Sequence, residues 1–193
     1  MELVLIRHAQ PISEQRSDGR PADPPLSVTG FKQSLAVADW VGRNPPDRLI
    51  SSPALRARQT AAPTAERLGQ EVEIDGRLSD ANPDLESYVT VEEARARDPI
   101  AHRARMAAYR EGDQLASASI RVNAALDEWT AAHPGKRLVV FCHGSVVNVY
   151  AARILGLSEF VFLDAEYASG HRFLVSRDGI RSIQSLNETV YLT

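Results

Sequence analysis

Two short runs of apolar residues constrain the fold of this chain more than any other feature. Residues 3–6 (LVLI) and 138–141 (LVVF) are apolar at every position, with no polar residue alternating between them. A continuous run of this kind is typical of a strand buried on both faces, as in the centre of a parallel sheet. We therefore expect both runs in an α/β sheet that helices cover on its two sides.

Length and composition indicate one domain. The chain has 193 residues, of which 44% are hydrophobic and 24% are charged, which is ordinary for a globular protein with a full core. No repeat and no linker divides it, so we expect residues 1–193 to form a single domain.

Charge and cysteine content exclude several classes of protein. The net charge of −3 gives no reason to expect a nucleic acid or a membrane surface as partner. Cys142 is the only cysteine, which excludes an internal disulfide and a cysteine-rich metal site. Arg7 interrupts the first apolar run, and no segment approaches the ~18 apolar residues that span a membrane. We expect a soluble, cytoplasmic protein.

The spacing of apolar residues, helix caps and turn residues predicts the other elements. Helices are expected at about 28–42, capped by Ser27 or Thr29, and at about 52–69, 90–110 with a break at Pro99, 113–132 and 146–155. Strands are expected at 48–51, 72–74, 160–163, 172–175 and 180–183.

Three details of these predictions depend on single residues. Ser52 is expected to cap the second helix with Pro53 at its first position, and Pro63 to kink or break that helix. Ile120 is placed among the core contacts of the helix at 113–132.

Five arginines between residues 95 and 110 are expected on a solvated helical face, with guidance of an anionic substrate as the alternative.

Polar residues follow four of the predicted strands directly or after a short loop. In a parallel sheet with helical crossovers, the carboxyl ends of the strands lie at one edge, where α/β proteins bind ligands. We therefore expect these residues to converge, with two histidines and two arginines facing a carboxylate. In chain order they are Arg7 and His8, Ser52 and Arg56, Asp80, and His143 and Gly144.

These residue types suit a phosphate ester. A transferring phosphoryl group spreads negative charge over three oxygens, and arginine offers paired N–H donors at any relevant pH. Helix starts after Ser52 and Gly144 would add backbone N–H groups. Gln10, Gly144 and Ser145 are the expected substrate contacts, and a small phosphorylated metabolite is the expected partner. No metal ion or cofactor is required if arginines and histidines supply the positive charge.

His8 is the expected nucleophile. A neutral imidazole can attack phosphorus and form a phosphohistidine, provided that its other ring nitrogen is tied to a carbonyl. His143, if protonated, would stabilise the transferring group electrostatically. Asp80 is the expected proton donor to the leaving alcohol, with a pKa raised from about 3.9 by burial or by another carboxylate. Asp84 and Glu86 are competing donors.

Four motifs in this order resemble those of the histidine phosphatase superfamily, which includes the cofactor-dependent phosphoglycerate mutases. The resemblance implies a three-layer α/β/α sandwich of the phosphoglycerate mutase type, with a mostly parallel central sheet and an antiparallel edge. It also implies phosphorylation of His8 in a pocket of Arg7, Arg56 and His143, with a helical insertion at about 76–133 over the active site. The motifs are R-H at Arg7, L-S-x-x-G from Leu26, S-x-x-x-R-A-x-x-T-A from Ser52, and H-G at His143.

Departures from the family pattern leave alternatives open. Ala9 stands where the usual motif has glycine, and Asp80 stands where the family has glutamate. We favour a metal-independent phosphatase, because the loop elements with which mutases hold phosphoglycerate are missing. A mutase and a non-catalytic phosphate-binding or regulatory protein are the alternatives. A cysteine phosphatase is excluded because Asn148 stands six residues after Cys142, where arginine is required.

The substrate itself cannot be read from the sequence. The residues that select it fall in the irregular regions at about 11–25 and 76–112. The oligomeric state is also open, with a homodimer as one outcome.

Overall fold

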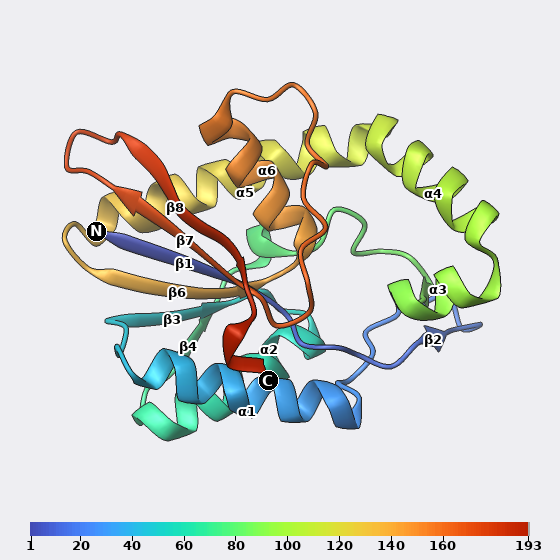
Figure 1. Cartoon of the computed structure of the whole chain (residues 1–193), viewed down its shortest axis with the longest axis horizontal. Helices are drawn as coiled ribbons and strands as arrows, with labels where there is room; N and C mark the ends of the chain where they lie inside the picture. Colours follow the sequence, from blue (N-terminus) through green and yellow to red (C-terminus); the bar gives the residue numbers. More distant parts are fainter. Residues whose placement is uncertain (193) are drawn as a thin grey trace.

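A central sheet organises the structure, a computed structural model that describes residues 1–192 (Figure 1). Within these residues, six strands form this sheet in the order β4-β3-β6-β1-β7-β8. Strands β4, β3, β6 and β1 are parallel to one another, and β7 and β8 add an antiparallel edge beside β1. The strands are β1 (Glu2–Arg7), β3 (Arg48–Ser51), β4 (Val72–Ile74), β6 (Arg137–Cys142), β7 (Gly170–Val175) and β8 (Arg181–Glu188).

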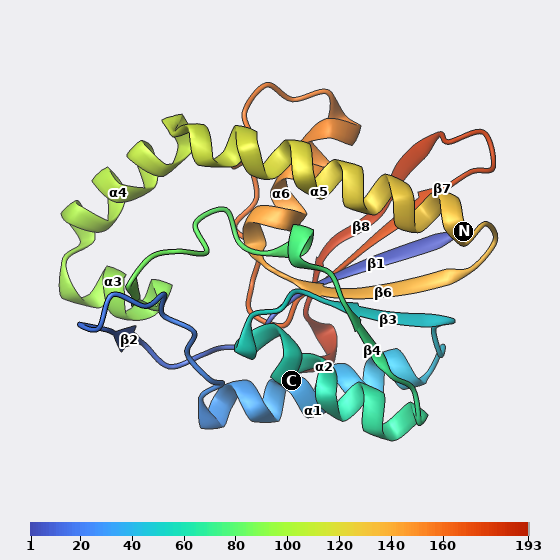
Figure 2. The ribbon, with the colours of Figure 1, turned by 180° about the vertical axis from the view of Figure 1, so that it is seen from behind.

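Helices cover both faces of the sheet, which confirms the predicted three-layer α/β/α fold. One face carries α1 (Val28–Gly42) and α2 (Leu55–Leu68), and the other carries α5 (Asp113–Ala132) and α6 (Gly144–Leu155) (Figures 1 and 2). The bounds of these helices lie within about three residues of the predicted ones. Among the described residues, no helix combines the length and the apolar character that crossing a membrane requires.

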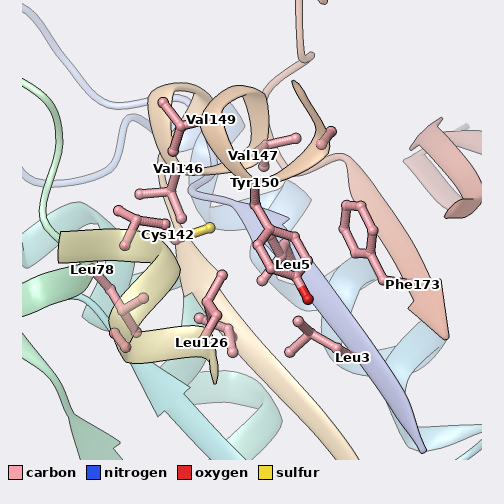
Figure 3. Packing of buried hydrophobic residues seen from close by; sticks show 14 of the residues in the cluster. Leu3, Leu5, Leu78, Leu126, Cys142, Val146, Val147, Val149, Tyr150 and Phe173 are labelled. Carbon is pink, nitrogen blue, oxygen red and sulfur yellow. The ribbon is translucent and has the colours of Figure 1, made fainter. Parts of the chain in front are cut away.

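The two apolar runs form the centre of the sheet, as predicted. Because successive side chains of a strand point to opposite faces, β1 supplies two separate cores. Leu3 and Leu5 pack beneath α5 and α6, where Figure 3 shows them near Tyr150, whereas Val4 and Ile6 pack beneath α1 and α2. All four β1 side chains are fully buried. A strand that serves both faces has no place for a polar residue.

A smaller set of elements lies beyond the carboxyl ends of the parallel strands. Helices α3 (Val91–Arg97) and α4 (Pro99–Glu111) stand away from the sheet in both views (Figures 1 and 2). The break at Pro99 is as predicted, and Asp98 caps α4 by accepting from the backbone N–H groups of Ile100 and Ala101. The short strands β2 (Glu14–Gln15) and β5 (Ser87–Tyr88) pair beside them. Two 3₁₀ turns, η1 (Gly76–Leu78) and η2 (Val190–Leu192), complete the described elements.

The predicted start of α2 at Ser52 is wrong. The helix begins at Leu55, and its N-cap position, Ala54, makes no side-chain capping bond. Ser52 is fully buried, and its hydroxyl instead lies 2.8 Å from Nε2 of His143. The helix also continues through Pro63 to Leu68, so the expected break does not occur.

The strand predicted at 160–163 is also absent. The backbone there is irregular, because the buried amide of Asn148 satisfies it in place of a neighbouring strand. The Asn148 side chain accepts from the N–H groups of Phe162 and Leu163 and donates to the carbonyl of Leu163. A further correction concerns Ile120, which is 77% exposed and contributes nothing to the core.

The L-S-x-x-G motif has a physical explanation in the start of α1. Ser27 caps the helix, accepting from the N–H of Gly30 at 3.0 Å, and its own N–H donates to the carbonyl of Gln10. A Cβ at position 30 would lie 2.0 Å from that same carbonyl oxygen. Only glycine therefore allows α1 to pack against the segment that leaves β1.

We predict that Gly30→Ala destabilises the protein by about 2 kcal/mol, a typical overpacking cost. Alanine should gain about 1 kcal/mol of helix propensity, but the clash with the backbone of Gln10 outweighs that gain. Urea denaturation of the wild type and the variant measures the difference. Gly76→Ala is the matched control, because a Cβ there meets nothing within 4 Å. Equal stability of both variants would contradict this explanation of the motif.

Candidate active site

Strands β3, β6 and β1 are neighbours in the sheet, and the predicted polar residues that follow them begin at the same edge of the sheet. Arg7 is paired with Cys142 in the register of β1 and β6, and the N–H of His8 donates to the carbonyl of Cys142 at 2.8 Å. On the other side of β6, the N–H of Ser52 donates to the carbonyl of Phe141. The residues that follow each strand therefore emerge side by side.

The structure brings His8, His143 and Arg56 into direct contact. The two imidazole rings have centroids 5.2 Å apart. Arg56 Nε lies 3.3 Å from His8 Nε2, and Arg56 Nη2 lies 3.4 Å from His143 Nδ1. One buried guanidinium thus connects two histidines that are remote in the sequence.

The ring of His8 is oriented as a nucleophile requires. Its Nδ1 lies 2.9 Å from the carbonyl oxygen of Ala9, so Nδ1 carries the proton and Nε2 the lone pair. Burial lowers the pKa of His8 well below its ordinary value, and the positive charges of Arg56 and Arg7 lower it further. The imidazole is therefore neutral at physiological pH.

Arg7 is held on two sides and leaves a donor unused. Its guanidinium carbon lies 3.9 Å from the ring centroid of Tyr167, a cation–π contact, and Nη1 donates to the carbonyl of Ala165. Arg7 Nε is buried without a partner in the described structure. It faces the start of α6, since a Cβ on Gly144 would lie 3.7 Å from it. This nitrogen and the free N–H groups that begin a helix suit an anion.

The imidazole of His143 is fully buried and neutral. Its Nε2 contacts the hydroxyl of Ser52, and its Nδ1 lies 3.7 Å from Asp80 Oδ2. Burial lowers its pKa; Asp80 raises it, but Arg56 and Arg7 lower it again, and the net shift is downward. The positive charge on which the electrostatic role of His143 would depend is therefore disfavoured in this arrangement.

Asp80 also occupies the site, through Arg56 and Ser145. Its Oδ2 lies 3.5 Å from Arg56 Nη2, and its Oδ1 accepts from the Ser145 hydroxyl at 2.6 Å and from the N–H of Ala81. Burial raises the pKa of Asp80, but the positive charge of Arg56 and the hydrogen bonds from Ser145 and from the N–H of Ala81 outweigh burial and lower it. The upward shift expected from the sequence is thus absent in this arrangement.

The competing acids and Gln10 lie elsewhere. Asp84 and Glu86 are exposed and contact none of the two histidines and two arginines. The side-chain oxygen of Gln10 accepts from the hydroxyl of Ser27, and Gln10 lines a separate hollow with Gln33. Gln10 therefore supports the start of α1 and does not face His8.

A cavity of about 550 Å³ opens beside His8. Its floor includes Arg7, His8, Asp80, Gly144 and Ser145, and its walls come from α3, α4 and residues 161–165. Among the side chains that the structure describes, those of residues 1–110 and 112–192, no three His, Cys, Asp or Glu side chains are grouped as ligands for a metal ion.

Two tyrosines in the site were missed by the sequence analysis. Tyr167 stacks on Arg7, and the ring centroid of Tyr88 lies 4.8 Å from the guanidinium carbon of Arg56. The ring centroids of Tyr88 and Tyr167 lie 6.4 and 5.7 Å from that of His8. Neither tyrosine belongs to a motif or follows a predicted strand, so no signal in the sequence pointed to them.

Solved structures share this fold over almost the whole chain. Mycobacterial glucosyl-3-phosphoglycerate phosphatase with inorganic phosphate gives a TM-score of 0.76 at 23% identity, covering 100% of this chain and 99% of that chain. Phosphoserine phosphatase from Entamoeba histolytica with 3-phosphoglyceric acid gives 0.74 at 21% identity, with the same coverage. At these identities the likeness concerns the fold.

The sequence itself establishes the family. The profile of the histidine phosphatase superfamily (branch 1) matches residues 3–189. The probable phosphoglycerate mutase GpmB of Escherichia coli O1:K1 is 30% identical over 164 residues, which are 81% of this chain and 76% of that protein. The chain belongs to the histidine phosphatase superfamily, branch 1, and is an enzyme of that type.

Proposed function

We propose that this enzyme is a phosphatase that hydrolyses the phosphomonoester of a small metabolite through a phosphohistidine on His8. The observation that carries the proposal is the state of the His8 ring. Its Nδ1 proton is tied to the carbonyl of Ala9, and its Nε2 lone pair faces the Arg56 guanidinium. A nucleophile beside a fixed positive charge suits attack on an anionic phosphoryl group.

In the first step, His8 Nε2 forms a bond to phosphorus while the bond from phosphorus to the leaving oxygen breaks. Arg7 Nε, Arg56 and the N-terminus of α6 offer donors for the three phosphoryl oxygens. The leaving oxygen takes a proton, and Asp80 is the carboxyl group placed beside Arg56 and His143 to supply it.

Substrate binding itself changes the protonation of Asp80 and His143. A phosphoryl dianion competes with Asp80 for Arg56 and places negative charge beside both groups. Negative charge raises the pKa of a carboxyl group and of an imidazole. Asp80 thereby gains the proton that it lacks in the ligand-free site, and His143 gains positive charge.

In the second step, water attacks phosphorus on the opposite side from His8. Asp80, now a carboxylate, accepts a proton from that water as the bond to oxygen forms and the bond to Nε2 breaks. Inorganic phosphate and neutral His8 are the products. The cycle uses charges already present in the chain, so we propose that it is independent of metal ions.

Phosphoglycerate mutase activity is the second candidate, because the E. coli relative carries that name. The phosphatase is favoured because structural neighbours are named phosphatases. Incubation with 3-phosphoglycerate and catalytic 2,3-bisphosphoglycerate separates the two reactions. A mutase forms 2-phosphoglycerate, whereas a phosphatase releases only inorganic phosphate. A folded protein that releases none from a broad panel of esters would support the non-catalytic alternative.

We also make proposals about the domain organisation and the cellular location of the enzyme. We propose that the chain is a single domain in which the segment at about 76–133 lies over the active site, as the cavity walls from α3 and α4 suggest. The one cysteine, Cys142, is free and buried, in keeping with a cytoplasmic protein.

His8→Ala should abolish turnover, because the other imidazole beside Arg56, that of His143, has its Nε2 on the Ser52 hydroxyl and its Nδ1 toward Asp80. We expect at least a 1,000-fold loss of kcat with p-nitrophenyl phosphate, on the order of the loss of an essential nucleophile. Rapid quenching with radiolabelled substrate should trap an alkali-stable, acid-labile phosphoryl group on the wild type and none on the variant. His133→Ala, remote from the site and stacked on Trp129, should behave like the wild type. Turnover of His8→Ala within tenfold of wild type would refute the covalent mechanism.

Asp80→Asn should lower the rate of hydrolysis most for substrates whose leaving group is most basic. An alkoxide needs a proton in the transition state, so we expect a 10²- to 10⁴-fold loss with an alkyl phosphate, the usual range for a general acid. The loss with p-nitrophenyl phosphate should be much smaller, since nitrophenolate leaves without a proton. Asp84→Asn is the matched control and should change neither rate. Equal losses on both substrates would show that Asp80 is not the donor.

A further inference from the structure

The cavity beside His8 is larger than a phosphoryl group and a three-carbon acid require. Its volume of about 550 Å³ falls in the range of sites that enclose a drug-sized ligand. The phosphoryl pocket occupies only its floor. The rest of the cavity lies against α4 and residues 161–165, away from the residues that act on phosphorus.

One face of α4 lines this part of the cavity. Residues on that face recur at helical spacing, and they include His102, Arg103, Met106, Tyr109 and Arg110. None of the described side chains of α4 is fully buried, so the helix contributes little to the core of the protein. The composition of its inner face is therefore better explained by a ligand than by packing.

Part of the cavity lining is apolar and aromatic. It includes Met106 of α4, Val161 and Phe162 of the segment that follows α6, and Tyr88 and Tyr109. Residues 162 and 163 are held by the buried amide of Asn148, which gives this wall a fixed position. Such a lining suits a ring or another bulky apolar group.

The same α4 face carries unpaired positive charge. Arg103 and Arg110 line the cavity and are exposed, and no described carboxylate pairs with either. They stand seven residues apart, about 10 Å along the helix, on one side of it. Arg95 also lines the cavity, but Asp164 neutralises it at 2.8 Å. Two guanidinium groups that no described carboxylate neutralises, near an apolar chamber, suit a second anionic group of the ligand.

We infer that the natural substrate is a phosphomonoester whose alcohol part is bulky and partly apolar and carries a second anionic group. The inference rests on the proposed phosphatase activity and deepens it. His8 and its neighbours hold the phosphoryl group, the chamber between α4 and residues 161–163 encloses the body of the alcohol, and Arg103 and Arg110 bind its anionic end. Small phosphorylated acids reach the floor of the cavity but leave the chamber empty.

Four synthetic esters separate the effects of size and charge: phenyl phosphate, 4-carboxyphenyl phosphate, 2-naphthyl phosphate and 6-carboxy-2-naphthyl phosphate. Phosphate release gives kcat and KM for each, with p-nitrophenyl phosphate as the measure of the basic activity. We expect 6-carboxy-2-naphthyl phosphate to have the highest kcat/KM, at least tenfold above phenyl phosphate, mainly through a lower KM.

Variants of α4 test which residues are responsible. Arg103→Ala and Arg110→Ala should lower kcat/KM about tenfold for the carboxylated esters alone, as for loss of a charged hydrogen bond. Met106→Ser should reduce the preference for the naphthyl ring. Arg177→Ala is the matched control and should change none of these rates. Arg177 lies in the turn after Val175, whose N–H donates to the carbonyl of Met1, at the end of the sheet opposite the active site.

The outcomes distinguish the two levels of the proposal. Two results would overturn the inference and leave the phosphatase activity established, provided that p-nitrophenyl phosphate is hydrolysed. One is an equal kcat/KM for all four esters. The other is a loss of kcat/KM in the arginine variants that is the same for esters with and without a carboxylate. Failure of the folded wild type to hydrolyse any of the five compounds overturns the phosphatase and the inference together.

Discussion

The buried guanidinium of Arg56 is the charge around which this site is built. It is 5% exposed, and it contacts His8, His143 and Asp80 at once. A buried charge without a partner costs several kcal/mol, so such a group demands an anion. In the ligand-free protein Asp80 meets part of that demand. We interpret Asp80 as occupying the place of the phosphoryl group, to be displaced from Arg56 when substrate arrives.

This exchange explains how one arrangement of charges serves both a nucleophile and an acid. The arginines keep the pKa of His8 low, which preserves the lone pair that the proposed mechanism requires. Arg56 also lowers the pKa of Asp80 and so keeps it ionised. In the proposed mechanism, the proton on Asp80 and the positive charge of His143 arise when a phosphoryl dianion binds. That mechanism does not need the raised pKa of Asp80 that the sequence led us to expect.

The parts of this structure that were predictable from sequence are those that depend on local chemistry or on the central sheet. Buried strands must be apolar, and Gly30 must lack a Cβ beside the carbonyl of Gln10, so both left a clear pattern. The failures involve long-range partners. Ser52 was misread as a helix cap because its bond to His143 joins two distant strands, and residues 160–163 were misread as a strand because Asn148 satisfies their backbone. Tyr167 stacks on Arg7 through contacts that no local pattern reveals.

In our proposal, the sheet holds the residues that act on the phosphoryl group, and the outlying helix α4 holds those that select the substrate. The strand ends fix Arg7, His8 and His143 through backbone register, so their geometry tolerates little change. By contrast, α4 contributes no fully buried side chain among those described, and substitutions on its inner face cost little stability. Such a helix can carry arginines and a methionine for a particular ligand without disturbing the fold. Under our proposal, the features of α4 therefore indicate the alcohol that this enzyme accepts, whereas the features of the sheet indicate the reaction.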